Sequence, residues 1–338
     1  MSEKYPIDFV VTWVDGNDPV WQAEKAKYSP NKNADNRNVR FRDWDNMQYW
    51  FRAVEKFAPW VNKIHFVTYG HLPKWLNIDN PKLNIAKHSD FIPQKYLPTF
   101  SSQPIELNLH RINGLAERFV YFNDDMFLLR PVKRELFFAG KDCLPTDFAI
   151  TSTISTTTKE DMMPFIKLNC VTILNGHFDK KEQMKKHFSK WVNLAYGWNA
   201  LRNLIFYGQH RFKGFANNHL AFSFLKSEYE DIWEKEYESL DDTSSHKFRS
   251  KLDLDNWLIR YWQLTRGNFY PIGRHVKGKV YEIYNGVEQN QELFKIIENQ
   301  AMPMICINDN DNVDFEPMKE RIKQAFDKIL PEKSSFEK

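Results

Sequence analysis

The sequence predicts an α/β protein with a mostly parallel sheet and a helical insertion. Apolar runs rich in β-branched and aromatic residues alternate with amphipathic segments of helix length through residue 140. Polar turn residues directly follow two of these runs, at 15–19 and 123–125. Strand, helix and strand in this order predict right-handed βαβ units, and therefore parallel strands.

The first part of the chain, 1–145, is expected to form the sheet. Residues 7–14, 63–68, 83–86 and 119–122 are predicted strands. Apolar residues at helical spacing predict helices at 50–57 and 101–116, and Pro59 ends the first of them. We interpret this part as a Rossmann-type sheet of the nucleotide-binding kind, although neither GxGxxG nor a P-loop motif is present.

Residues 146–214 are interpreted as a helical insertion or cap, with a helix expected at 191–206. Lysines at 180–190 form a basic face, which is either solvated surface or a contact with anionic lipid.

The last part, 215–338, is interpreted as the second part of the catalytic domain. We expect a helix from residue 221 to 238 and another that begins at Asp253 as its N-cap and ends at Gly267. Strands are predicted at 278–283 and 304–307, before a final amphipathic helix at 316–330.

Composition limits the class of partner. The chain has 338 residues, 42% hydrophobic and 27% charged, as in soluble globular proteins. The net charge of +3 is too small to indicate nucleic acid, so we expect no nucleic-acid partner. No signal-peptide pattern or long apolar run is present, and Cys143, Cys170 and Cys306 are widely spaced. These features predict a cytoplasmic protein.

The chemistry is expected to centre on Asn123-Asp124-Asp125, which directly follows the strand at 119–122. Adjacent carboxylates at a strand end suit Mg²⁺ or Mn²⁺, and such a metal offsets the charge of a diphosphate. The other interpretation is an ordinary turn, because Asn and Asp are common after strands.

Other polar groups could contribute to the same site. Asp15 and Asn17 follow the first strand, where open α/β sheets place ligands. Arg42 and Asp43 could grip phosphate or form structural ion pairs. Asp309 follows the strand at 304–307 and repeats the arrangement of a carboxylate after a strand.

His246 and Arg249 precede a helix start, a position that favours anions. Histidine can act as a general base at neutral pH, and arginine can bind phosphate with two parallel hydrogen bonds. The alternative for this loop is a set of capping and salt-bridging contacts.

Four blocks of sequence, at 7–19, 40–138, 215–267 and 305–336, resemble the Stealth family of hexose-1-phosphotransferases. The blocks include IDFVVTWVDGNDP, YFNDDMFLLRPV and SSHKFRSKLDLDNWLIRYWQL. The resemblance implies a GT-A-like fold and transfer of sugar-1-phosphate from a UDP-sugar, most often a UDP-N-acetylhexosamine. It also implies Mg²⁺ or Mn²⁺, release of UMP, and a role in capsular or cell-surface polysaccharide synthesis.

On this basis we hypothesise a role for each candidate residue. Asp124 and Asp125 hold the metal or align the diphosphate, Asp309 is a further candidate ligand of the metal, and Asp125 is also a candidate catalytic residue. The donor pocket is formed by Asp15, Asn17, Arg42, Asp43 and Asn123. Arg249 stabilises phosphate charge, and either His219 or His246 is the general base.

The acceptor is expected to be an oligosaccharide or a lipid-linked glycan, which would bring the protein to the inner face of the membrane. Two rival hypotheses remain open at the level of sequence. A metal-dependent GT-A glycosyltransferase would use the same donor but release UDP. A non-catalytic component of a polysaccharide complex would bind the UDP-sugar without turnover.

Overall fold

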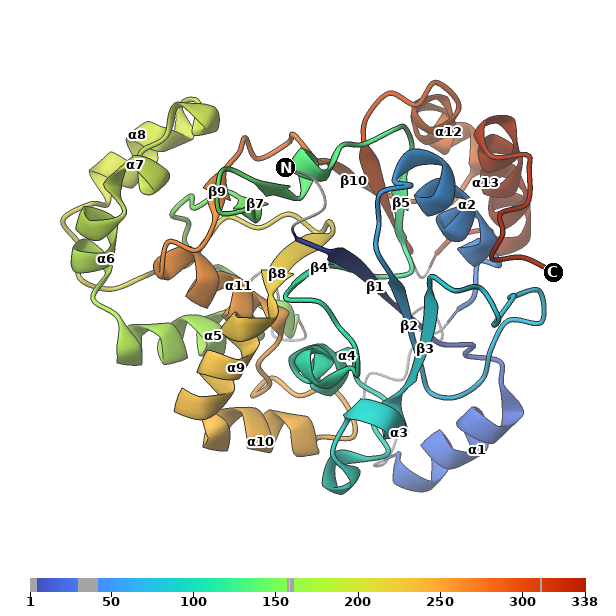
Figure 1. The fold of residues 1–338 in the computed structure, drawn as a ribbon, viewed down its shortest axis with the longest axis horizontal. Coiled ribbons are helices and arrows are strands. Elements are labelled where there is room, and N and C mark those ends of the chain that lie inside the picture. The colour runs from blue at the N-terminus through green and yellow to red at the C-terminus, as the bar shows by residue number, and fades with distance from the viewer. Residues whose placement is uncertain (1–4, 30–41, 157, 159–160, 311) are drawn as a thin grey trace.

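A five-stranded sheet forms the centre of the protein (Figure 1). The structure is a computed structural model that describes residues 5–29, 42–156, 158, 161–310 and 312–338. The strand order is β3-β2-β1-β4-β8. Four strands are parallel: β1 (Ile7–Trp13), β2 (Ile64–Thr68), β3 (Leu83–Lys87) and β4 (Arg118–Phe122). The fifth, β8 (Phe222–Leu225), runs antiparallel to β4. The expected α/β fold with a mostly parallel sheet is therefore confirmed.

Both faces of the sheet are buried, which explains why its strands are apolar runs without polar alternation. Phe9 and Val11 of β1 point into one hydrophobic cluster, and Val10 points into a second. In β4, Val120 belongs to the first cluster and Phe119 to the second.

The first cluster is covered by α2 (Met47–Phe57), α12 (Gln291–Glu298) and α13 (Phe315–Ile329), together with a second sheet (Figure 1). That sheet has the order β10-β11-β5 and consists of β10 (Gly278–Glu282), β11 (Met304–Asn308) and β5 (Met126–Leu128). Because β11 pairs antiparallel with β5, Cys306 lies opposite Met126, directly after the Asn123–Asp125 turn.

The second cluster is covered by α4 (Ser102–Leu107), α5 (Met163–His177), α9 (Lys226–Lys235), α10 (Tyr237–Ser245) and α11 (Asn256–Thr265). Two short helices, α1 (Pro19–Tyr28) and α3 (His88–Phe91), lie near the carboxyl ends of β1 and β3 (Figure 1). A third, small sheet consists of β6 (Phe138–Ala139), β7 (Leu144–Asp147) and β9 (Tyr270–Pro271).

The segment between α5 and β8 contains α6 (Lys180–Lys186), α7 (Phe188–Trp191) and α8 (Asn199–Ile205). The helix predicted at 191–206 is interrupted, because Gly197 adopts φ 56° after a short 3₁₀ turn at Leu194–Tyr196. Among the described helices, none combines the length and apolar character that crossing a bilayer requires.

Two predicted helices differ from the structure. The single helix expected at 101–116 is wrong beyond Leu107, where a 3₁₀ turn at Leu109–Arg111 follows. Asn108 causes the break, because its side chain donates to the Pro104 carbonyl and to Ser244 and competes with the helical pattern.

The helix predicted at 221–238 is wrong at its start, since Phe222–Leu225 pair with β4 as a strand. Pairing with a distant strand here overrides local helical spacing. The predicted N-cap of α11 is also wrong. Asp255 accepts from the Trp257 N–H at 2.9 Å, whereas Asp253 accepts from the Ser250 N–H at 2.7 Å.

Candidate functional site

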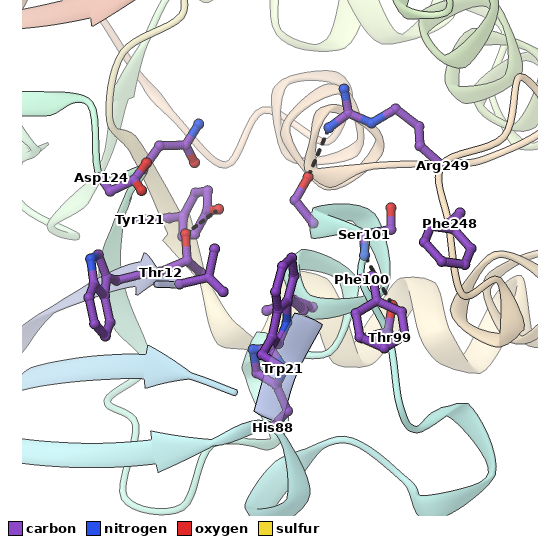
Figure 2. A pocket seen from close by; sticks show the side chains of 15 residues that line it. Thr12, Trp21, His88, Thr99, Phe100, Ser101, Tyr121, Asp124, Phe248 and Arg249 are labelled. Atoms are coloured by element: carbon purple, nitrogen blue, oxygen red, sulfur yellow. Dashed lines mark hydrogen bonds between the residues drawn. The ribbon is translucent and has the colours of Figure 1, made fainter. Parts of the chain in front are cut away.

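Three adjoining pockets open at the carboxyl ends of β1 and β4, and we call them together the β1–β4 cleft. The first, of ≈ 250 Å³, is lined by residues that include Trp13, Trp21, Asp124 and Arg249 (Figure 2). The second, of ≈ 550 Å³, shares Trp13 and Asp124 with the first. The third, of ≈ 730 Å³, shares Trp21 with the first pocket, and Arg42 and Asp43 with the second. The cleft is therefore continuous.

The Asn123–Asp125 turn lies at the junction of the first two pockets. Its backbone is closed by a bond from the Met126 N–H to the Asn123 carbonyl at 3.3 Å. Asn123 and Asp124 line the first pocket, and Asp124 and Asp125 line the second. The turn thus presents two carboxylates to one cavity.

Asp125 is the centre of a group of possible metal ligands. Its Oδ2 lies 3.4 Å from His219 Nε2 and accepts from the Cys306 thiol at 3.3 Å. Ligand atoms of these three residues lie within 4.8 Å of one another. Asp125 Oδ1 is buried and has no hydrogen-bond partner, which is a costly state for a carboxylate oxygen unless a cation or substrate donor occupies it.

The donor set fits a hard cation best through its carboxylates. Burial raises the pKa of the Cys306 thiol well above its usual value, so this sulfur stays protonated and donates to Asp125. Burial, followed by the carboxylates of Asp125 and Asp43, raises the pKa of Asp124 to about 7. Asp124 still reaches solvent within the cleft, so a divalent cation entering there would relieve this repulsion.

His219 is held beside this pair of carboxylates. Burial alone would lower its pKa, but the contact with Asp125 outweighs burial, and the net pKa is raised. Asn123 Nδ2 lies 3.5 Å from His219 Nε2. The His219 side chain is 41% exposed, so a substrate can reach it.

The loop that carries His219 is fixed by polar contacts on its other side. Asn217 Nδ2 donates to the Tyr261 hydroxyl at 2.7 Å, and Arg260 donates to Asn217 Oδ1 at 2.6 Å. Arg274 Nε donates to Asn218 Oδ1 at 3.1 Å. These bonds set the direction of the backbone immediately before His219.

Arg249 and His246 belong to one loop but have different surroundings. Arg249 lines the first pocket, where its Nη2 donates to Ser102 Oγ at 3.2 Å (Figure 2). His246 Nδ1 is 2.6 Å from the buried carboxylate of Asp253. His246 is not among the lining residues of the cleft in the described part of the chain. The structure therefore brings Arg249, but not His246, to the cleft.

Arg42, Asp43 and Asp309 line the second pocket. The alternatives for Arg42 were phosphate binding and ion pairing, and here it pairs with Asp309 through bonds of 3.0 and 2.6 Å. Trp44 Nε1 also donates to Asp309 Oδ2 at 3.0 Å. These bonds engage both Asp309 oxygens. In the same pocket, burial raises the pKa of Asp43, and nearby carboxylates raise it further.

Asp15 and Asn17 form the turn after β1. The Asp15 N–H donates to His71 Nε2 at 2.8 Å, and Asp15 Oδ1 accepts from the Asn17 N–H at 2.8 Å. Asn17 lines the third pocket, while Asp15 shapes the turn. Asp18 then caps α1 by accepting from the Trp21 N–H at 2.7 Å, which fixes Trp21 in the cleft wall.

Several residues of the site gave no local signal in the sequence. Tyr121, Glu106 and Thr12 form a chain in which the Tyr121 hydroxyl bonds to Thr12 at 3.2 Å and to Glu106 at 3.3 Å. Burial raises the pKa of Glu106, and the Arg249 charge partly compensates. Only the pairing of distant strands and helices brings these groups together, as it does for Cys306.

Two family models match parts of the chain, and several relatives align with it from end to end. Residues 5–33 match Stealth protein CR1, conserved region 1, and residues 40–144 match Stealth protein CR2, conserved region 2. The chain is 42% identical over 343 residues to capsular polysaccharide phosphotransferase WcwK of Streptococcus pneumoniae, covering 100% of both proteins. It is 41% identical over 344 residues to receptor polysaccharide phosphotransferase WefC of Streptococcus gordonii, again covering 100% of both.

A solved structure of the galactosyltransferase LgtC with donor and acceptor sugar analogs covers 94% of this chain and 95% of that chain. The identity is 9% and the TM-score 0.36. The relatives at about 40% identity span both proteins end to end. The chain therefore belongs to the Stealth protein family and is an enzyme of the transferase class.

Proposed function

We propose that this enzyme transfers sugar-1-phosphate from a UDP-sugar to a hydroxyl of a glycan acceptor. The proposed donor is a UDP-N-acetylhexosamine. A phosphodiester linkage forms and UMP is released, in capsular or cell-surface polysaccharide synthesis. The observation that carries the proposal is the unpartnered, buried Oδ1 of Asp125 beside His219 and Asp124. The names of the relatives, which are polysaccharide phosphotransferases, support the same chemistry.

In the proposed reaction, the acceptor oxygen attacks the phosphorus nearest the donor sugar. A new oxygen–phosphorus bond forms, and the bond between this phosphorus and the oxygen of the UMP phosphate breaks. His219 takes the proton of the acceptor hydroxyl. Arg249, which faces the first pocket, stabilises charge on the diphosphate (Figure 2).

Asp124 and Asp125 would hold Mg²⁺ or Mn²⁺, which offsets phosphate charge when bound. The remaining cleft residues bind the donor: Asn17 and Asp43 line its walls, Asn123 lies beside His219, and Asp15 shapes the turn after β1. Arg42 and Asp309 hold each other in one wall of the second pocket. His246 is assigned to positioning the Arg249 loop through its bond to Asp253.

The test is the identity of the released nucleotide. Purified enzyme is incubated with UDP-N-acetylglucosamine, UDP-N-acetylgalactosamine, UDP-galactose or UDP-glucose, with Mg²⁺ or Mn²⁺ and an oligosaccharide or lipid-linked glycan acceptor. UMP, lost on chelation of the metal, supports the proposal. UDP would instead establish a metal-dependent GT-A glycosyltransferase, in which the acceptor attacks the anomeric carbon.

Matched variants test the assignment of residues. Asp125→Asn and His219→Ala should abolish turnover and keep cooperative unfolding. The controls are Asp142→Asn and His210→Ala, since both side chains are exposed and lie outside the lining of the cleft. Full activity in Asp125→Asn or in His219→Ala would refute the role of that residue.

We further propose that the reaction takes place in the cytoplasm. The three cysteines of the chain are all free, as in a reducing compartment. A lipid-linked acceptor would bring the enzyme to the inner face of the membrane, whereas an oligosaccharide acceptor would not require this contact.

A further inference from the structure

Helix α8 and the turn before it expose their apolar side chains to solvent. Leu194 is 96% exposed and Trp198 is 90% exposed. Leu201, Leu204 and Ile205 of α8 are exposed as well. We call these five residues the α8 face. Trp198, Leu201 and Ile205 recur at helical spacing, and exposed apolar side chains gathered on one helix face mark an interaction site.

Polar bonds of Asn203 fix α8 to the body of the protein, and Ala200 of this helix packs against a small hydrophobic cluster. Asn203 is the buried residue of the helix. Its Nδ2 donates to the carbonyls of Ala149 and Trp191 at 2.6 and 2.5 Å, and its Oδ1 accepts from the Thr151 N–H at 2.8 Å. The α8 face therefore contributes little to folding, so packing within this chain does not explain its apolar side chains.

The segment that presents the α8 face is strongly basic. Residues 180–213 contain eight lysines and arginines and a single carboxylate, Glu182, for a net charge of +7, although the whole chain carries only +3. Lys181, Lys185 and Lys186 of α6 are exposed, and so is Arg202 within α8 itself. Helices α6, α7 and α8 follow one another along one edge of the molecule (Figure 1).

We propose that the α8 face docks onto the surface of an anionic phospholipid membrane. Tryptophan and leucine side chains insert at the boundary between headgroups and acyl chains, and neighbouring lysines and arginines attract anionic headgroups. A second copy of this chain would bring like-charged segments together, whereas an anionic lipid surface complements them. Apolar and basic groups in one short segment thus favour lipid as the partner.

Docking here leaves the catalytic cleft accessible. In Figure 1, α6, α7 and α8 lie at the edge of the molecule far from α1 and α13, whereas residues of α1 and α13 line the third pocket of the cleft. Binding to lipid should therefore not block the cleft. The inference does not depend on the proposed reaction, because lipid binding can be measured without any donor or acceptor.

The experiment is sedimentation of the full-length enzyme with vesicles of phosphatidylglycerol and phosphatidylcholine, compared with phosphatidylcholine alone. We expect binding to the anionic vesicles that weakens at high salt. Leu194→Ser/Trp198→Ser should reduce the partition coefficient at least tenfold. Lys185→Glu/Lys186→Glu should reduce the partition coefficient by roughly fivefold or more for each residue, because one basic residue near an anionic surface contributes about 1 kcal/mol.

Exposed residues elsewhere supply matched controls. Ile78→Ser/Tyr284→Ser removes exposed apolar side chains outside this segment, and Lys133→Glu/Lys279→Glu reverses exposed charges there. Both controls should bind vesicles as the wild type does. All variants should release nucleotide normally with a water-soluble oligosaccharide acceptor, which separates lipid binding from catalysis.

Failure of the wild type to sediment with anionic vesicles would overturn the inference. Equal losses in the control variants would do the same, because they would show that the α8 face is not the site. A dimer in lipid-free solution that Leu194→Ser/Trp198→Ser abolishes, together with no vesicle binding, would show that a second copy covers this face.

Discussion

Replacing Arg260 by methionine should destabilise the protein more than any change at a surface ion pair. Arg260 is 1% exposed, and its Nε and Nη2 donate to the two oxygens of Asp147, each at 2.8 Å. Its other bonds reach the carbonyls of Phe148 and Ala216 at 3.1 and 3.2 Å and Asn217 Oδ1 at 2.6 Å. One side chain therefore ties α11 to β7 and to the loop before β8.

The magnitude follows from what the substitution leaves behind. Arg260→Met keeps most of the buried volume but leaves the Asp147 carboxylate without its cation, and breaking a buried pair from one side costs about 3–5 kcal/mol. The Phe148 N–H still donates to Asp147 at 2.7 Å, and the nearby Lys277 charge also favours Asp147, which offsets part of the loss. We therefore expect the free energy of unfolding to fall by about 3 kcal/mol, the lower end of this range.

The assay is urea unfolding followed by tryptophan fluorescence, with a shifted midpoint and an unchanged slope. The control is Lys226→Met, which breaks the pair between Lys226 and Glu230 at 3.9 Å, with side chains 30% and 58% exposed. Pairs open to solvent contribute about 0–1 kcal/mol, so this control should shift the midpoint little. Arg260→Met/Asp147→Asn should be less destabilised than the sum of its single variants, because the two residues are coupled.

Two results would refute this reasoning. One is a loss of less than about 1 kcal/mol in Arg260→Met, the size expected of a surface pair. The other is strict additivity of Arg260→Met and Asp147→Asn. Either result would mean that solvent or rearrangement satisfies Asp147 once its partner is removed.

Three further predictions concern pH and packing. Burial, and secondly the nearby Glu106 charge, raises the pKa of Asp255 to about 7. Wild-type stability should therefore fall as pH rises from about 4 to 7, and Asp255→Asn should flatten this part of a profile of urea midpoint against pH. Burial lowers the pKa of His110 to about 3, so stability should be lost as pH falls below about 6.5. His110→Phe should be more stable than wild type at pH 5 by about 1–2 kcal/mol, and the two proteins should have equal stability at pH 8. Gly278→Ala would place a Cβ 1.8 Å from the Met304 carbonyl oxygen at φ +148°. It should lower the free energy of unfolding by more than about 3 kcal/mol, measured by thermal or urea unfolding. Gly286→Ala, with open space around the new Cβ, should be as stable as wild type. Equal melting of the two glycine variants, or parallel pH profiles for wild type and either titration variant, would contradict the corresponding prediction.

The errors made from sequence alone have a common physical cause. Residues 222–225 have apolar spacing that suits a helix, yet they complete the sheet because β4 offers an unpaired edge. Asn108 breaks α4 through bonds to Pro104 and to the distant Ser244. In both places, contacts between residues far apart in the sequence outweigh local propensity.

The candidate site was predicted unevenly for the same reason. Asp124 and Asp125 could be found from the sequence, because two carboxylates directly after a buried strand form a local pattern. Cys306 could not be found, since it reaches Asp125 only through the antiparallel pairing of β11 with β5. Sequence also left His219 and His246 as rivals, and the structure places only His219 against Asp125.

The sequence by itself determined the parallel α/β sheet, the two carboxylates after β4 and the resemblance to the Stealth family, because these depend on runs of neighbouring residues. Only the tertiary structure decided which groups share the cleft, since Arg249, His219 and Asp124 come from three separate segments. Likewise, the basic segment at 180–213 is visible in the sequence, but the outward direction of Trp198 and Leu194 is not. The placement of α8 is set by the bonds of Asn203 to backbone outside the helix, which no local pattern encodes.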